Sequence, residues 1–362
     1  VADPLIPSPL VAPPAADSVY TPVPNKDAHK ASLGLNADSI IIGTVMRNQR
    51  RKLFPDLFES FKKFLDETKR PNVYLYCHTT YPDVGWNIPE LIIKNGLTNR
   101  VLLTYACSGC GATFPSFFHD ALTECKHCHR FQAKLTNPRE GVSTEVLAGI
   151  VNTFDLYVQY ANSEGFGLPQ TEAASCGVPV MSVDYSAMSS VIRKIDGTPL
   201  KPIALYRELE TGCMRAVPDN NYFVEKLTEF CSLPKSVRRN KGFQARKAFE
   251  KNYGWDESAK KWEDLIDVVE IRNEKETWNS PPNIHKPSKE YPENLDTKTF
   301  VDWLIINVLG DTDKLNSYMA ARLIRDLNYG VSTEGAGGVY YNDGSLLSTS
   351  PKNKRFLEKD AY

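Results

Sequence analysis

Residues 163–177 read SEGFGLPQTEAASCG, a glycine-containing turn that passes into a short run of helix-forming residues. Apolar stretches flank it on both sides, DLYVQYA at 155–161 and VPVMSVD at 178–184, and each has the length and composition of a buried strand. Pro169 suits the first position of a helix, where its missing N–H group does no harm. The stretch therefore predicts a strand, a loop, a short helix and a second strand.

The turn also brings two acidic residues, Glu164 and Glu172, close to a helix N-terminus. Gly165 and Gly167 let a backbone approach a ligand, and the N-terminus of a helix favours a phosphate. Ionised carboxylates accept hydrogen bonds and therefore suit hydroxyl groups. A nucleotide sugar, with phosphates between two polyols, fits this layout. The simpler alternative is that Glu172 offsets the helix dipole and Glu164 is a solvated loop residue.

Strand and helix alternate over the whole region from residue 39 to 184. The apolar patterns predict strands at 39–45, 72–78, 100–106, 155–161 and 178–184, and helices at 53–67, 87–96, 143–154 and 169–177. Such alternation is typical of an α/β fold with a parallel sheet covered on both faces. Ligands of such sheets bind beyond the carboxyl ends of the strands, which is where the turn after residue 161 lies.

The flanking regions predict three parts in the chain. Residues 1–36 begin with a proline-rich linker or arm, residues 37–270 form the α/β domain, and residues 271–362 form a linker followed by a mostly helical extension. Further helices are expected at 222–232, 234–249, 255–271, 296–310 and 313–330, and a small hairpin at 339–347.

The composition of the 362 residues, 41% hydrophobic and 24% charged, is typical of a soluble globular protein. A net charge of −1 argues against a surface that binds polyanions throughout. The sequence predicts neither a membrane span nor a signal segment. Four of the eight cysteines form two C-x-x-C pairs, which indicates a metal site in a reducing compartment, interpreted as the cytoplasm.

The two C-x-x-C pairs lie fourteen residues apart in CSGCGATFPSFFHDALTECKHCH at 107–129, within an insert predicted at 105–138. Four thiolates at this spacing predict a closed, tetrahedral zinc site with a structural role. The predicted ligands are Cys107, Cys110, Cys125 and Cys128, with His127 or His129 as possible replacements. A redox-active C-x-x-C pair is the alternative.

Several motifs together resemble glycosyltransferase family 4. EGFGLPQTEAASCGVPVMSVD at 164–184 resembles the E-x7-E signature of that family and its flanking residues. IIGTVMRNQRRK at 41–52 is similar to its G-x-x-x-R-x4-K loop. RAVPDNNYFVEKL at 215–227 and YGWDESAKKWEDLI at 253–266 resemble later segments of the donor half. The resemblance covers residues 20–270 and implies the C-terminal, Rossmann-like domain of a GT-B fold.

The resemblance also implies roles for residues of the turn. Glu164 would contact the donor sugar and Glu172 would hold the ribose hydroxyls. The donor would be a UDP- or GDP-linked sugar. Its sugar and phosphates would be lined by backbone groups of Gly165, Phe166, Gly167 and Leu168.

The loop after the first strand would hold the diphosphate. Gly43, Arg47 and Lys52 match the family motif, and the cations Arg47 and Lys52 would stabilise the charge that develops on the leaving group. Arg50 and Arg51 are neighbours that could take either role, and a solvated basic turn is the alternative for the whole run.

The implied activity is transfer of a hexose to an unknown acceptor with retention of the anomeric configuration. The acceptor half of such an enzyme has no counterpart in the sequence, so we expect another chain or a missing segment to supply it. The alternative function is a binding module that uses the zinc lobe to hold nucleic acid or a protein partner.

Overall fold

The computed structural model describes residues 11–119, 122–137, 141–209 and 211–268, together with the backbone of two short strands near the C-terminus. It divides into two units, Val1–Val268 and Val269–Tyr362. In the second unit, β12 (Val339–Tyr340) and β13 (Leu346–Ser348) pair antiparallel, as the hairpin prediction requires. The helices expected at 296–310 and 313–330 lie outside the described residues.

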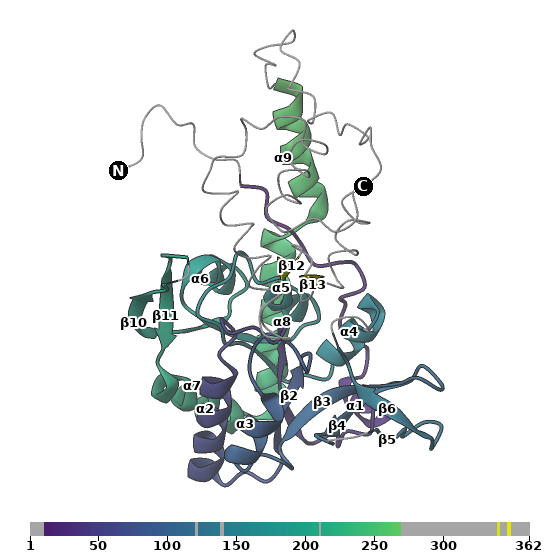
Figure 1. Ribbon diagram of the computed structural model, residues 1–362. Coiled ribbons are helices and arrows are strands. Elements are labelled where there is room, and N and C mark those ends of the chain that lie inside the picture. Colours follow the sequence, from purple (N-terminus) through teal and green to yellow (C-terminus); the bar gives the residue numbers. More distant parts are fainter. Residues whose placement is uncertain are drawn as a thin grey trace, which may run out of the picture. The chain divides into compact units, whose positions relative to one another are not determined.

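The first unit is built on a nine-stranded sheet with a parallel centre (Figure 1). The parallel strands follow the order β3-β2-β1-β7-β8-β9, which is the doubly wound order of dinucleotide-binding folds. Their bounds are Ile40–Val45 (β1), Val73–His78 (β2), Val101–Cys107 (β3), Leu156–Gln159 (β7), Val180–Val183 (β8) and Thr198–Leu200 (β9). The predicted fold class and all five predicted strands are confirmed.

Helices cover both faces of the sheet, as two buried clusters show. The cluster on one face includes side chains of α2 (Phe54–Thr68), α3 (Ile88–Lys94) and α7 (Asn220–Ser232). The cluster on the other face includes side chains of α4 (Thr144–Val151), α5 (Leu168–Ser175), α6 (Ser186–Lys194) and α8 (Lys235–Asn252). α9 (Trp255–Val268) follows and is largely exposed. Burial on both faces explains why the strands are continuous apolar runs.

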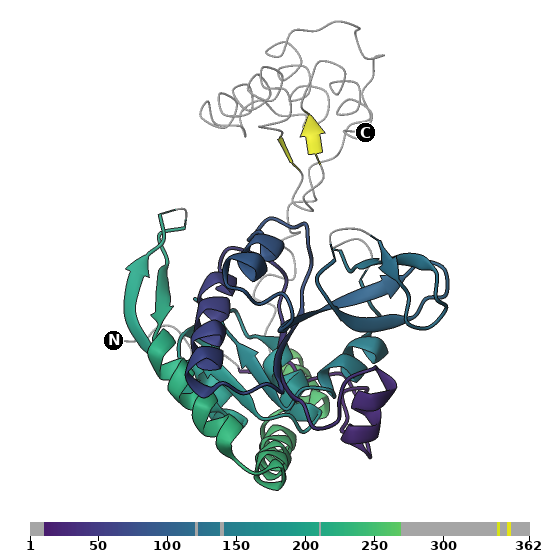
Figure 2. The same cartoon turned by 90° about the horizontal axis from the view of Figure 1, so that it is seen from below.

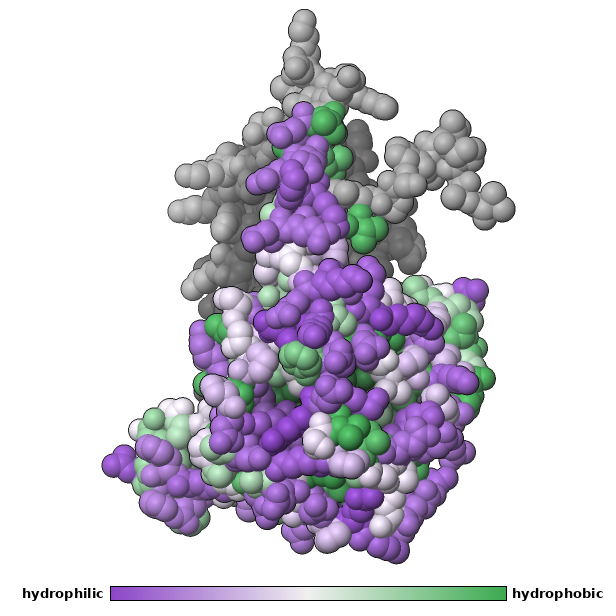
Figure 3. Space-filling model, turned by 180° about the vertical axis from the view of Figure 1, so that it is seen from behind, coloured by the Kyte–Doolittle hydropathy of each residue, from purple (hydrophilic) through white to green (hydrophobic). Residues whose placement is uncertain are grey.

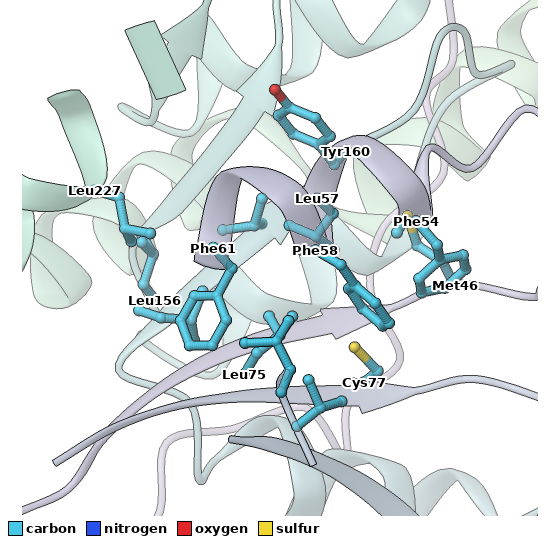
Figure 4. Packing of buried hydrophobic residues seen from close by; sticks show 14 of the residues in the cluster. Met46, Phe54, Leu57, Phe58, Phe61, Leu75, Cys77, Leu156, Tyr160 and Leu227 are labelled. Carbon is cyan, nitrogen blue, oxygen red and sulfur yellow. The ribbon is translucent and has the colours of Figure 1, made fainter. Parts of the chain in front are cut away.

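The phenylalanines of α2 anchor the first of these faces (Figure 4). Phe54, Phe58 and Phe61 recur at helical spacing and are fully or almost fully buried. They point toward the sheet, where Leu75 and Cys77 of β2 lie beneath them. This packing fixes the start of α2, and therefore the end of the loop that precedes it.

A close approach under β1 explains one glycine. Gly43 lies inside the strand, and a Cβ atom at this position would be 2.1 Å from ring carbons of Phe154. Phe154 in turn packs edge-to-face on Tyr76, with ring centroids 5.5 Å apart. Gly43 therefore makes room for the second buried cluster.

The described part of the N-terminal arm packs on the α/β domain. Ala15, Ala16 and Tyr20 are buried, and α1 (Lys26–Ser32) follows, capped by Asn25. The arm is held by side chains of the domain, since Asn152 donates to the carbonyl of Thr21 over 2.9 Å. A segment of low core-forming capacity is thus ordered by contacts made far along the chain.

Two appendages extend the domain on opposite sides (Figures 1 and 2). The first, here called the cysteine lobe, consists of β4 (Thr113–Phe117), β5 (Thr123–Glu124) and β6 (Phe131–Leu135) with their turns. β4 and β6 pair antiparallel with β3, and β5 pairs antiparallel with β6. The second is a two-stranded hairpin of β10 (Pro202–Arg207) and β11 (Met214–Pro218). The sequence analysis did not predict the hairpin, α1, α6 or β9.

The surface is largely hydrophilic. Figure 3 shows one face on which apolar side chains form small, separate groups. Among the described residues, no helix combines the length and hydropathy that crossing a bilayer requires.

Candidate functional site

The strand order of the sheet reverses between β1 and β7, and the loops that leave these two strands meet at this point. The first, here called the basic loop, comprises residues 46–53. The amide of Leu53 donates to the carbonyl of Tyr160 over 3.1 Å, and the amide of Asn162 donates to the carbonyl of Arg51 over 2.9 Å. The basic loop is therefore held directly against the loop at residues 160–167, here called the acidic loop.

An ion pair joins the two loops. The ammonium of Lys52 contacts Oε1 of Glu164, and both side chains are nearly buried, at 9% and 8% exposure. Arg51 places Nη2 3.8 Å from the other carboxylate oxygen. Burial lowers the pKa of Lys52 and the nearby Arg51 lowers it further, whereas the Glu164 carboxylate in contact with it favours the charged ammonium. The sequence prediction that Lys52 and Glu164 share one site is consistent with this geometry.

Arg47, the other cation predicted for this site, takes a different direction. Its guanidinium makes a bidentate pair with Asp83, with Nε and Nη2 3.1 and 3.2 Å from the carboxylate oxygens. The Arg47 side chain is 55% exposed while Asp83 is buried. In this arrangement Arg51, and not Arg47, lies beside Lys52 and Glu164. Arg50 is exposed.

The turn into α5 presents backbone donors. Gly167 caps the helix with φ of 87°, a left-handed conformation that favours glycine. Within the described part of the chain, the N–H groups of residues 165–168 donate no hydrogen bond. Phe166 packs edge-to-face on Tyr253 and Leu168 is partly exposed. The N-terminus of α5 thus offers unpaired donors next to the acidic loop, as an anion site requires.

Glu172 lies on α5, is half-buried, and lies near the N-terminal arm. Its carboxylate interacts with the hydroxyl of Tyr20, a buried residue of that arm. Burial raises the pKa of Glu172 to about 7, the Tyr20 hydroxyl lowers it, and the carboxylate of Asp17 raises it. A group with this pKa changes its charge near neutral pH.

Two buried polar side chains of β7 lie near the glutamates. The hydroxyl of Tyr157 donates a hydrogen bond to Oε1 of Gln159, and Tyr157 interacts electrostatically with Glu172. Gln159 donates from Nε2 to Oε1 of Glu164 over 3.1 Å. Sequence reasoning missed Tyr157 and Gln159, because both fall in a run that reads only as a buried strand. The available signal was their spacing, because Tyr157 and Gln159 are two positions apart in the strand and therefore point to the same side of β7.

Three further residues, Gly43, His78 and Cys176, are held by packing or by a hydrogen bond. Gly43 lies within β1, three positions before Met46 and packed on Phe154, so the structure gives it a packing role. His78 ends β2 and is held by Thr104 at 2.9 Å, and burial lowers its pKa to about 4. Cys176 is buried at the end of α5.

The hairpin contributes two side chains to the acidic loop. The hydroxyl of Tyr206 accepts from Nδ2 of Asn162 over 3.1 Å. Nη1 of Arg215 donates to the hydroxyl of Ser163. Neither residue was predicted from the sequence, where the hairpin lacks a regular apolar pattern.

The four predicted cysteines converge in the cysteine lobe. All four sulfur atoms lie within 4.8 Å of one another, and two of the distances, between Cys107 and Cys128 and between Cys110 and Cys125, are 3.7 Å. Four sulfurs at about 2.3 Å from one tetrahedral zinc ion would lie about 3.8 Å apart. The donor set and its spacing therefore fit zinc.

The two C-x-x-C turns have matching backbones. In the first, Gly111 has φ of 72° and donates to the carbonyl of Cys107 over 2.9 Å. In the second, His129 has φ of 57° and donates to the carbonyl of Cys125 over 2.9 Å. Such paired turns aim both thiols of each motif to the same side. Nδ1 of His129 lies 3.0 Å from Oε1 of Glu124, which argues against His129 as a metal ligand in place of a cysteine.

Comparisons with known proteins relate the chain to glycosyltransferases. No protein-family profile matches it. D-inositol 3-phosphate glycosyltransferase of Rhodococcus erythropolis is 29% identical over 186 residues, which cover 51% of this chain and 34% of that protein. Sucrose-phosphate synthase of Thermosynechococcus elongatus matches in structure with a TM-score of 0.50 and 18% identity, over 71% of this chain and 51% of that enzyme. The chain thus spans about a third of the curated relative and half of the solved one.

The structural match supports the fold and no more, because the identity is low. The predicted α/β class with a Rossmann-like parallel sheet is confirmed by it. The curated relative adds a similarity to an enzyme whose name states glycosyl transfer.

Proposed function

We propose that this chain is the donor-binding half of a glycosyltransferase that moves a hexose from a nucleoside-diphosphate sugar to an acceptor. The observation that supports it most is the meeting of the basic and acidic loops at the strand-order reversal of the sheet, with Lys52 paired to Glu164. Open α/β sheets bind nucleotides at this place. The similarity to a D-inositol 3-phosphate glycosyltransferase points to the same class of reaction.

The diphosphate of the donor fits between the basic loop and the N-terminus of α5. Lys52 and Arg51 supply positive charge from one side, and the N–H groups of residues 165–168 supply donors from the other. Arg47 joins them if its pair with Asp83 opens. Gly43 shapes β1 beneath this site.

The two glutamates fit the hydroxyl groups on either side of the diphosphate. Glu164 accepts from the hexose and Glu172 from the ribose, because each carboxylate has several acceptor positions. Gln159, which is held by Tyr157, fixes the position of Glu164. The backbone of Gly165, Phe166, Gly167 and Leu168 lies between the two acids and faces the sugar.

Breaking the bond between sugar and phosphate leaves added negative charge on the diphosphate. Fixed cations and backbone donors stabilise this charge without having to reorient during the reaction. Family 4 membership and retention of the anomeric configuration remain part of this proposal, and they rest on the sequence motifs at 41–52 and 164–184.

The four cysteines of the lobe are proposed to hold one structural zinc ion. Zinc bound by four thiolates is closed to substrate and stabilises the turns around it. The lobe extends the edge of β3, so the metal would fix this edge of the sheet.

The acceptor-binding half is proposed to come from another chain or from a segment outside residues 1–362. The predicted parts at 1–36, 37–270 and 271–362 and a cytoplasmic location belong to the same proposal. If the chain does not bind a donor, the favoured alternative is a binding module that holds nucleic acid or a protein partner at the cysteine lobe.

Titration calorimetry with UDP-glucose and GDP-mannose tests the donor site. We expect micromolar binding of one of the two, lost in Glu164→Gln and weakened in Glu172→Gln. Glu145→Gln is the matched control, because Glu145 is an exposed glutamate of α4. Absence of binding by the folded wild-type chain, with salt-dependent binding of nucleic acid in its place, would refute the proposal.

A further inference from the structure

The β10–β11 hairpin lies against the acidic loop. Its strands pair only with each other among the described strands, and Ile203, Leu205 and Tyr206 are exposed along β10. At its base, the amide of Ala216 donates to the carbonyl of Asn162 over 3.0 Å. The hairpin therefore places its side chains at the end of β7, next to Glu164.

Arg215 on β11 is the cation that the hairpin brings to this place. Its side chain is 19% exposed and lies between two partners, Ser163 of the acidic loop and Glu208 of the hairpin. Nη2 is 2.7 Å from the Glu208 carboxylate. Each terminal nitrogen of a guanidinium carries two N–H groups, so these contacts leave one donor on each nitrogen. Nε is buried and has no partner among the described residues.

A second guanidinium lies nearby. Burial lowers the pKa of Arg51, and the positive charges of Arg215 and Arg47 lower it further. Arg51 shares its carboxylate, Glu164, with Lys52. Like charges held close together repel each other, and a bound anion removes this repulsion.

We propose that Arg215 binds the diphosphate of the donor together with Arg51, so that the hairpin supplies part of the phosphate site. This inference rests on the proposed function and extends it to a residue outside the two loops. A planar guanidinium with two free N–H groups matches a phosphate in bidentate geometry. The purely structural alternative is that Arg215 only ties the hairpin to the acidic loop.

Three variants separate these roles. Arg215→Gln removes the charge. Glu208→Gln breaks the ion pair that anchors Arg215 but keeps its charge. Arg207→Gln is the matched control, because Arg207 is an exposed arginine of the same hairpin that donates to the carbonyl of Gly212 over 2.6 Å.

Calorimetry measures the affinity of each variant for the sugar nucleotide that the wild-type chain binds. Competition calorimetry measures its affinity for the nucleoside alone. Arg215→Gln should weaken binding of the sugar nucleotide by about 10- to 100-fold, as expected for a charged hydrogen bond. Its affinity for the nucleoside should stay unchanged. Glu208→Gln and Arg207→Gln should change neither.

Three results would overturn the inference. One is an unchanged affinity of Arg215→Gln for the sugar nucleotide. The other two mark a structural role: a loss of the same size in Arg215→Gln and Glu208→Gln, and a loss in Arg215→Gln that includes the nucleoside. If Arg215→Gln does not fold, Arg215→Lys takes its place with the same comparison. A wild-type chain that binds no sugar nucleotide would instead refute the proposed function.

Discussion

Donor binding should depend on pH through Glu172. Burial raises the pKa of this carboxyl to about 7, and the ionised form accepts hydrogen bonds from both ribose hydroxyls. With that pKa, about a tenth of the side chains are ionised at pH 6 and about nine tenths at pH 8. Affinity for a sugar nucleotide should therefore rise by up to about tenfold between these two values.

Tyr20, Tyr157 and Cys176, which interact with Glu172, stay neutral over this range and do not add to the pH dependence. Burial raises the pKa of Tyr20 and Tyr157 above its ordinary value and raises the pKa of Cys176 to about 12. Asp17 adds negative charge that favours the protonated carboxyl. The pyrophosphate diester of a sugar nucleotide has no proton to lose near neutral pH, so the ligand does not contribute.

Lys52 is the group that acts in the opposite direction. Burial and Arg51 lower its pKa to about 7, and the contact with Glu164 favours the charged form. Loss of the Lys52 proton above neutral pH would weaken binding. The assay is calorimetry from pH 5.5 to 8.5 on the wild-type chain, Glu172→Gln and Lys52→Arg. We expect the full rise between pH 6 and 8 in Lys52→Arg, a smaller rise in the wild type, and no rise in Glu172→Gln. A flat profile in Lys52→Arg, or a profile that Glu172→Gln leaves unchanged, refutes the reasoning.

Three further predictions concern other contacts. Gly43→Ala should lower the free energy of unfolding in urea by about 1–3 kcal/mol, because the added Cβ would meet the Phe154 ring. Adding Phe154→Leu should recover part of this loss. An unchanged unfolding midpoint in Gly43→Ala would contradict the packing role. Plasma mass spectrometry should find one zinc ion per chain. Cys110→Ser should reduce the zinc content and lower the melting temperature. A chain that holds no metal after refolding with added zinc would contradict the site. Tyr20→Phe should move the pH midpoint of donor binding upward, because the Tyr20 hydroxyl lowers the pKa of Glu172; a midpoint that stays or falls would argue against this contact.

Much of the fold could be predicted because its signals are local. Buried parallel strands are apolar runs in the sequence. Strands were therefore predicted at residues 39–45 and 155–161, where the structure has β1 and β7. The four cysteines were also predicted as one group, since their spacing allows few other arrangements.

Long-range contacts could not be predicted in the same way. The contact of Tyr20 with Glu172 joins positions 152 residues apart, and nothing in a proline-rich arm signals where it docks. The choice of Arg51 over Arg47 beside Glu164 depends on the pair that Asp83 makes with Arg47. The hairpin that carries Arg215 has mostly exposed residues on β10, so no alternation of buried and exposed positions marks it.

The central claim is that the basic and acidic loops form one site for a sugar nucleotide. A crystal structure of the chain with UDP-glucose or GDP-mannose tests it most directly. We predict the diphosphate between Lys52 and the N-terminus of α5, with hydroxyl groups of the ligand on Glu164 and Glu172. A ligand that binds elsewhere on the domain, with its phosphates in contact with neither Lys52 nor residues 165–168, would contradict the account.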